Sequence, residues 1–189
     1  GPLPAMSGTA YMLRHNLRAS ACTYLFRRSL LGNLRFIQGI LHEDEAFTPQ
    51  LMLRARTVLD TGSAAYAYRR HASSITTRTD QNHIRRRLAD KEAVIVMLDR
   101  LSHHLPPQQT MALRRRVSQL TMDLMLDTAR LTDGPEPLRQ LVSRLRPASL
   151  YPLPLKPYTP AYFLFSLLSA SSVGLSLLRP LVSKLTAER

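Results

Sequence analysis

Residues 34–49 read LRFIQGILHEDEAFTP, and the prediction of the fold starts from them. Three carboxylates stand side by side at residues 43–45, in a protein whose formal net charge is +13. The apolar run over residues 35–40 predicts a short strand. From Asp44 onward apolar residues recur every four positions, which predicts a helix to about residue 56. The pattern is therefore that of a strand delivering carboxylates to the start of a helix, and we name residues 41–47 the acidic knot.

The composition is that of a globular protein with an anionic partner. Of the 189 residues, 44% are hydrophobic and 21% are charged, which argues against wholesale disorder. The basic excess is nearly all arginine, whose planar guanidinium pairs well with phosphate and carboxylate. Such a charge favours nucleic acid, a phospholipid surface or a nucleotide diphosphate. Cys22 is the only cysteine, which excludes an intrachain disulfide and a cysteine-based metal cluster.

Other segments before residue 80 also predict strands. Residues 21–26 are rich in β-forming residues and predict a buried strand. Residues 57–59 and 64–68 predict a strand pair around a glycine-containing turn. A helix is expected to begin at Ser7, whose hydroxyl can cap it. The chain starts with glycine in place of an initiator methionine, so we expect it to be trimmed or part of a longer protein.

Beyond residue 80 the chain predicts helices. Residues 84–104 and 108–131 carry helical apolar spacing on either side of a proline pair, which predicts an antiparallel hairpin. Residues 161–178 contain no charge and predict apolar helices that pack in a core or lie at a membrane interface. The fold class expected is therefore α+β, a few short strands plus a helix, followed by a mainly helical C-terminal region. The expected regions are residues 1–79, 80–146 (a helical hairpin plus a short helix at 136–146) and 147–189 (a proline-rich linker and apolar helices).

The acidic knot admits more than one interpretation. Neighbouring carboxylates at a strand end can bind a divalent metal, or one of them can act as a general base toward an alcohol. The alternative is an acidic helix start that only complements the helix dipole. His42 is either a ligand, a hydrogen-bond partner or a structural residue.

The arginine-containing segments are interpreted in two ways. Arg69 and Arg70 are suited to hold a diphosphate, or they protect the edge of a strand with charge. Residues 73–77 carry hydroxyls that bind phosphate or cap the next helix. The arginine runs 85–87 and 114–116 are expected to be solvated helix faces, with a nucleic-acid surface as the alternative.

Taken in order, these segments resemble the carboxy-terminal half of family 2 glycosyltransferases. The resemblance is carried by residues 24–31, 34–49, 66–70 and 74–76, and it covers roughly residues 5–80. These are inverting enzymes of the GT-A type, and the helical tail looks like that of bacterial polysaccharide-building members. The resemblance implies the acceptor-side part of a GT-A fold, from a parent enzyme that moves a sugar from a nucleotide-sugar to an acceptor hydroxyl with inversion.

The resemblance also implies roles for individual residues. Asp44 would be the general base and Glu43 would orient the acceptor or the base. The expected substrate and diphosphate contacts are Arg69, Arg70, Ser74, Thr76 and His42. The metal ligands stay unassigned. Relatives often carry an arginine where this chain has His71, so that position is left open between a metal contact and a phosphate contact.

The chain departs from the family in having no nucleotide-binding half and no Asp-x-Asp motif. We therefore expect Mg²⁺ or Mn²⁺ only in the full-length parent, and we expect no transferase activity from this piece alone. The partners implied are a nucleotide-sugar and a glycan or lipid-linked acceptor, in the cytoplasm or peripherally on the inner face of the membrane. The alternative is a non-catalytic, basic helical module that binds nucleic acid or a protein partner.

Overall fold

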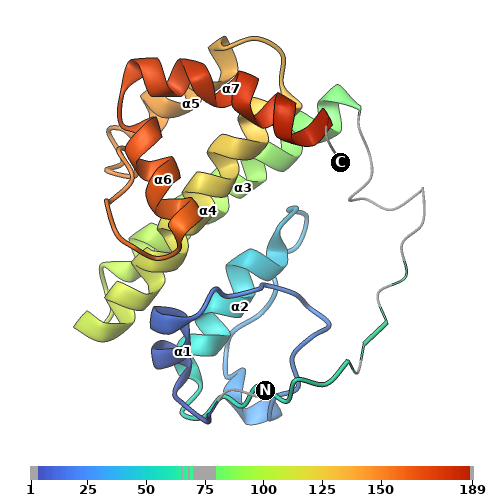
Figure 1. Ribbon diagram of the computed structural model, residues 1–189. Helices are drawn as coiled ribbons and strands as arrows, with labels where there is room; N and C mark the ends of the chain where they lie inside the picture. The colour runs from blue at the N-terminus through green and yellow to red at the C-terminus, as the bar shows by residue number, and fades with distance from the viewer. Residues whose placement is uncertain (1–3, 65, 68, 70–79, 188–189) are drawn as a thin grey trace. The chain divides into compact units, whose positions relative to one another are not determined.

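The computed structural model describes residues 4–64, 66–67, 69 and 80–187 (Figure 1). The fold is mostly helical, with 59% helix and 1% strand, and the described residues form no sheet. The expected α+β class is therefore wrong. The chain divides into two compact units, residues 1–116 and 117–189, and the boundary falls inside one long helix.

The first unit consists of short helices and loops followed by a long helix. Its elements are α1 (Gly8–Arg14), a 3₁₀ turn (Arg28–Leu30), α2 (Glu43–Arg54), α3 (Gln81–Ser102) and the beginning of α4 (Pro107–Leu131). Capping side chains start two of these helices. Ser7 Oγ accepts a hydrogen bond from the Ala10 amide, and Asp80 Oδ1 accepts one from the His83 amide.

Helix α2 is the centre of the first unit. Phe47 and Leu51, one turn apart on α2, pack with Leu34 in a small apolar core. Phe36 stacks on Phe47 with ring centroids 4.0 Å apart. On another side α1 packs against α2, as Figure 1 shows. The loop over residues 34–36 is thus held by side-chain packing rather than by strand pairing.

Two of the predicted strands, at residues 21–26 and 35–40, find no strand partner among the described residues. Residues 21–26 and 35–40 are loops and turns, and Leu25 of the first segment is fully exposed at 103%. In the described part of the chain, the strand-like pairing is a single antiparallel bridge between Met6 and Val58. Residues 65 and 68 of the last predicted strand lie outside the described residues. A β-forming sequence becomes a strand only when a neighbour completes its hydrogen bonds, so propensity alone misled the prediction.

The second unit confirms the helices expected in that part of the chain. After the remainder of α4 come α5 (Glu136–Leu145), α6 (Pro160–Ser169) and α7 (Ser172–Ala187). Tyr162 is fully buried, and its hydroxyl donates to the Pro154 carbonyl at 3.1 Å. The Tyr151 hydroxyl donates to the Ser169 carbonyl at 2.5 Å. These two phenols fasten α6 to the proline-rich segment before it. In the described residues no helix combines the length and apolarity needed to cross a membrane.

The contact of α1 with α2 requires a glycine at position 8. A Cβ there would lie 1.8 Å from the Met52 carbonyl oxygen, which is part of the α2 backbone and cannot move aside cheaply. We predict that Gly8→Ala lowers the free energy of unfolding by about 1–3 kcal/mol, the usual cost of overpacking. Urea unfolding followed by circular dichroism measures it. Thr9→Ala, in the same helix, is the control, and an equal loss in both variants would contradict the prediction.

The buried phenol of Tyr162 gives a prediction for alkaline pH. Burial raises the pKa of Tyr162 to about 12 from an ordinary 10.0. The folded state therefore holds this proton more tightly than the unfolded state does. The protonated phenol contributes fully to the free energy of unfolding below pH 10, and this contribution is lost as the pH rises through about 12. In an alkaline titration, Tyr162→Phe should remove part of the phenolate absorbance that appears near pH 12, which we call the late component. The pKa of Tyr24 is also raised to about 12, so a late component from that residue should remain. An unchanged late amplitude would show that Tyr162 titrates normally.

Candidate functional site

The acidic knot forms the start of α2. His42 precedes the helix with φ 67° and ψ 31°, a left-handed conformation that costs a residue with a Cβ roughly 1–2 kcal/mol. This turn brings Glu43, Asp44 and Glu45 into the first turn of the helix, where the helix dipole favours negative charge. Local strain of this kind is concentrated at functional sites. The predicted carboxylates are therefore at a helix start, as expected, but a turn rather than a strand delivers them.

The carboxylates of the knot have different environments. The Glu45 carboxylate receives two hydrogen bonds from Arg116 Nη2, at 2.7 Å to Oε1 and 2.5 Å to Oε2. Asp44 is half-buried, and its Oδ1 accepts a hydrogen bond from the Glu45 amide at 2.8 Å. Glu45 therefore forms an ion pair inside the protein. Glu43 and Asp44 are the carboxylates of the knot that we consider for ligand binding.

The protonation of Glu45 reflects this burial. Burial raises the pKa of the Glu45 carboxyl, and the guanidinium of Arg116 limits the rise. The charge of Asp44 adds to the rise, whereas the ammonium of Lys91 opposes it. Lys91 is itself buried in α3. Two cations from different helices thus stabilise one internal carboxylate.

Helix α3 fixes the loop that leads into the knot. Arg86 Nη2 donates to the Gly39 carbonyl at 2.6 Å, and Asp90 Oδ2 accepts from the Leu41 amide at 2.9 Å. Arg86 and Asp90 also form an ion pair with each other at 3.7 Å. Both backbone groups belong to the segment immediately before His42. The approach to the helix start is therefore positioned by two side chains of α3.

The arginine run 114–116 differs from the expected solvated face. Arg115 and Arg116 are buried, with 4% and 7% of their surface exposed. Arg115 Nη1 donates to the carbonyls of Met12 (at 2.7 Å) and His15, and its Nη2 donates to Asn16 Oδ1 at 3.0 Å. The expectation of solvation is wrong for these two residues. They bind the protein's own oxygens, so they offer little to a nucleic acid.

The predicted diphosphate contacts lie mostly outside the described residues. Arg69 is exposed. Arg70, His71, Ser74 and Thr76 fall in the part of the chain that is not described, so their roles stay predictions. Among the described residues no group of three histidine, cysteine, aspartate or glutamate side chains could hold a metal ion. The described part of the acidic knot therefore does not fit a divalent metal.

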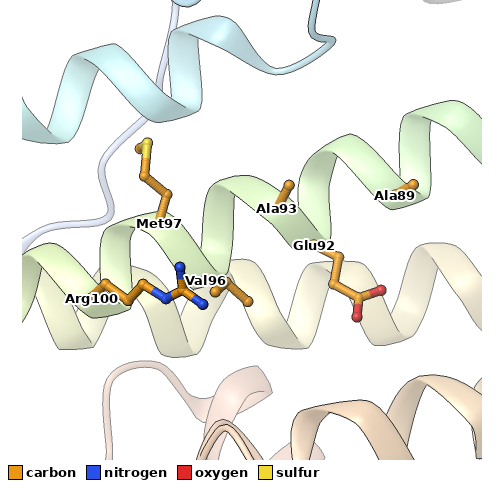
Figure 2. Close-up of a pocket in the computed structure, with 6 residues that line it drawn as sticks. All are labelled: Ala89, Glu92, Ala93, Val96, Met97 and Arg100. Carbon is orange, nitrogen blue, oxygen red and sulfur yellow. The ribbon is translucent and has the colours of Figure 1, made fainter.

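An open groove lies on α3 and is separate from the knot. Its six lining residues, drawn in Figure 2, are Ala89, Glu92, Ala93, Val96, Met97 and Arg100. They follow one another at helical spacing along α3, and none of them is a nucleophile or a histidine. The groove is therefore a weaker candidate for chemistry than the start of α2.

Sequence reasoning missed the partners of the knot. Arg116 is 71 positions from Glu45, and Asp90 is 49 positions from Leu41. No local pattern predicts such a contact. One feature of the sequence indicated that Arg115 and Arg116 are buried. They lie between Leu113 and Val117, and these two apolar residues belong to the core.

The ion pair between Arg116 and Glu45 gives a prediction for stability. Arg116→Ala would leave a largely buried carboxylate without its main counter-charge, so we predict a loss of about 3 kcal/mol in the free energy of unfolding, the lower end of the cost of breaking a buried pair. The control is Arg114→Ala, two positions earlier, whose half-exposed side chain faces Asp99 at 4.0 Å. Because half of the Arg114 side chain is in solvent and its charge lies 4.0 Å from Asp99, this pair should change stability by less than about 1 kcal/mol. Equal losses for both variants in urea unfolding would show that the buried pair has no special weight.

Comparison with known proteins adds no assignment to this geometry: the chain matches no protein-family model, no curated protein and no solved structure.

Proposed function

We propose that the acidic knot supplies the general base of a glycosyl transfer from a nucleotide-sugar to an acceptor hydroxyl, with Asp44 as the base. The observation that carries the proposal is the strained turn at His42 together with the different environments of the Asp44 and Glu45 carboxylates. Glu45 is neutralised internally, whereas Asp44 stands beside it in the same helical turn. A general base needs an oriented carboxylate, and the hydrogen bond from the Glu45 amide orients that of Asp44.

The step assigned to Asp44 is a proton transfer. The acceptor oxygen attacks the anomeric carbon, and the bond from that carbon to the diphosphate oxygen breaks with its electron pair. The nucleoside diphosphate leaves, and the acceptor proton passes to Asp44. Direct displacement of this kind inverts the anomeric centre. The amide of Glu45 holds Oδ1 of Asp44, so we assign proton uptake to Oδ2.

The neighbouring residues support the step by position. Glu43, one residue before the base, is assigned to orient the acceptor hydroxyl. Arg69 and Arg70, with Ser74, Thr76 and His42, are assigned to the diphosphate side, because the leaving group gains negative charge and needs fixed donors. These assignments rest on the resemblance to family 2 glycosyltransferases.

The remaining parts of such a reaction must come from elsewhere in a longer parent protein. This chain contributes no Asp-x-Asp motif, and its described residues do not fit a divalent metal, so no step is assigned to a metal here. The nucleotide-sugar and any Mg²⁺ or Mn²⁺ would bind to the rest of the parent. We therefore expect the piece alone to be inactive, and we place the parent in bacterial polysaccharide biosynthesis.

Asp44→Asn in the full-length parent tests the assignment of the base. The amide cannot take the acceptor proton, so kcat should fall by roughly 10²–10⁴-fold, the usual contribution of a general base. Binding of the nucleotide-sugar, measured by calorimetry, should stay unchanged. The matched control is Asp99→Asn, which removes an acid of α3 that contacts His103 and Arg114 instead of the knot.

Two outcomes of this experiment would contradict the proposal. If Asp44→Asn retains normal turnover, the base lies elsewhere. If the parent transfers no sugar at all while the chain binds nucleic acid with a steep salt dependence, the non-catalytic basic module takes its place.

A further inference from the structure

Helices α6 and α7 form a hairpin with an exposed apolar face. The two helices are separated by two residues and contact each other, and in Figure 1, in orange-red and red, they run at a wide angle to one another. The exposed large apolar side chains on them define the apolar face, which consists of Phe163, Leu164, Leu167, Val173 and Leu177. Leu164 is 64% exposed and Val173 is 69% exposed, so the face is open to solvent. A set of exposed large apolar side chains on two consecutive helices is a candidate interaction site.

Each helix of the hairpin has two distinct sides. On α6 residues 163, 164 and 167 fall on one arc of the helix, while Phe165 and Ser169 are buried on the other side. On α7 residues 173 and 177 are one turn apart, and Leu178 is buried. The internal core of the second unit thus uses different sides of the two helices from those that carry the exposed side chains. The apolar face is additional to what folding buries.

Close backbone contact fixes the hairpin. A Cβ at Gly174 would lie 1.7 Å from the Leu168 carbonyl oxygen, so only glycine allows α7 to approach α6 here. The Gly174 amide donates to Ser171 Oγ at 3.0 Å, which caps the start of α7. The apolar face is therefore formed before any partner binds, and binding need not order it.

The charge of the segment that carries the apolar face selects the kind of partner. Residues 137–187 contain no aspartate or glutamate. Their basic residues are Arg139, Arg144, Arg146, Lys156, Arg179 and Lys184. The side chains of the first four are exposed. An apolar face inside a segment that carries only positive charge is complementary to a surface that combines hydrocarbon with negative charge, and an anionic lipid bilayer has both.

We propose that the apolar face of α6 and α7 docks on the surface of an anionic lipid bilayer. Helix α6 has 10 residues and α7 has 16, which gives lengths of about 15 and 24 Å at 1.5 Å per residue. The helices lie along the interface, with the apolar face among the acyl chains and the four exposed basic residues facing the headgroups. This inference goes beyond the proposed function and does not depend on Asp44.

The absence of tryptophan from the chain allows a direct measurement of insertion. Leu164→Trp places a single fluorophore on the apolar face, and Met111→Trp places one on the exposed surface of α4, where Met111 is 62% exposed. Vesicles of phosphatidylcholine mixed with phosphatidylserine should shift the emission of the first variant to shorter wavelength and leave that of the second unchanged. A shift of equal size in both variants would overturn the assignment of the face.

Vesicle sedimentation measures the affinity and the role of charge. Removing two leucine side chains in Leu164→Ala/Leu167→Ala should weaken binding to the mixed vesicles by ~10-fold or more. Leu59→Ala/Met111→Ala, which truncates two equally exposed apolar residues outside the hairpin, should bind as the unaltered chain does. Asp44→Asn should also bind normally, so that a failure of the catalytic proposal and a failure of this one are told apart.

Three outcomes would overturn the proposal. Equal binding to pure phosphatidylcholine vesicles would remove the requirement for negative charge, and full binding by Leu164→Ala/Leu167→Ala would remove the apolar face. No vesicle binding, together with a concentration-dependent dimer that is lost in Leu164→Ala/Leu167→Ala, would assign the face to a second copy of the chain. Thermal unfolding by circular dichroism of this double variant checks that the helices persist.

Discussion

The first unit depends on one buried ion pair, between Arg116 of α4 and Glu45 of α2. A carboxylate removed from water is expensive unless its counter-charge and hydrogen bonds are supplied internally. Arg116 supplies both oxygens of Glu45 with a donor, and Lys91 adds a second positive charge nearby. The pair therefore ties α4 to α2 at the place where α2 starts. It also relieves the electrostatic cost of three adjacent carboxylates, which frees Asp44 to remain in the same turn.

The helices were predictable and the strands were not, for one physical reason. A helix satisfies its own backbone, so spacing such as Val94, Leu98 and Leu101 predicts it without knowledge of the rest of the fold. A strand needs a neighbour, and nothing in residues 21–26 or 35–40 says whether one exists. Phe36 shows the difference. Its β-forming character suggested a strand, yet the ring is held by stacking on Phe47 from a helix.

The candidate site was predictable to the same extent. The acidic run at 43–45 predicts a helix start, because the helix dipole favours negative charge there. In the structure α2 begins at Glu43. The left-handed conformation of His42 was not predicted, because glycine is the residue that normally signals such a turn. The supporting contacts from Arg86, Asp90 and Arg116 join residues far apart in sequence. No local rule identifies them, and they decide which carboxylate is available.

The hydrogen bonds of Arg115 carry a consequence for the order of folding during synthesis. Its guanidinium donates hydrogen bonds to the carbonyls of Met12 and His15 at the end of α1. These two residues precede Arg115 by 103 and 100 positions in the sequence. At ribosomal rates of about 5–20 residues per second, roughly 5–20 s separate the emergence of the two ends. During that interval the carbonyls at the end of α1 lack the hydrogen bonds from Arg115, and Glu45 of α2 lacks its ion pair with Arg116. The amino-terminal segment of the first unit is therefore expected to gain its final packing late, when α4 leaves the ribosome. This waiting period is when a chaperone would find its exposed apolar side chains.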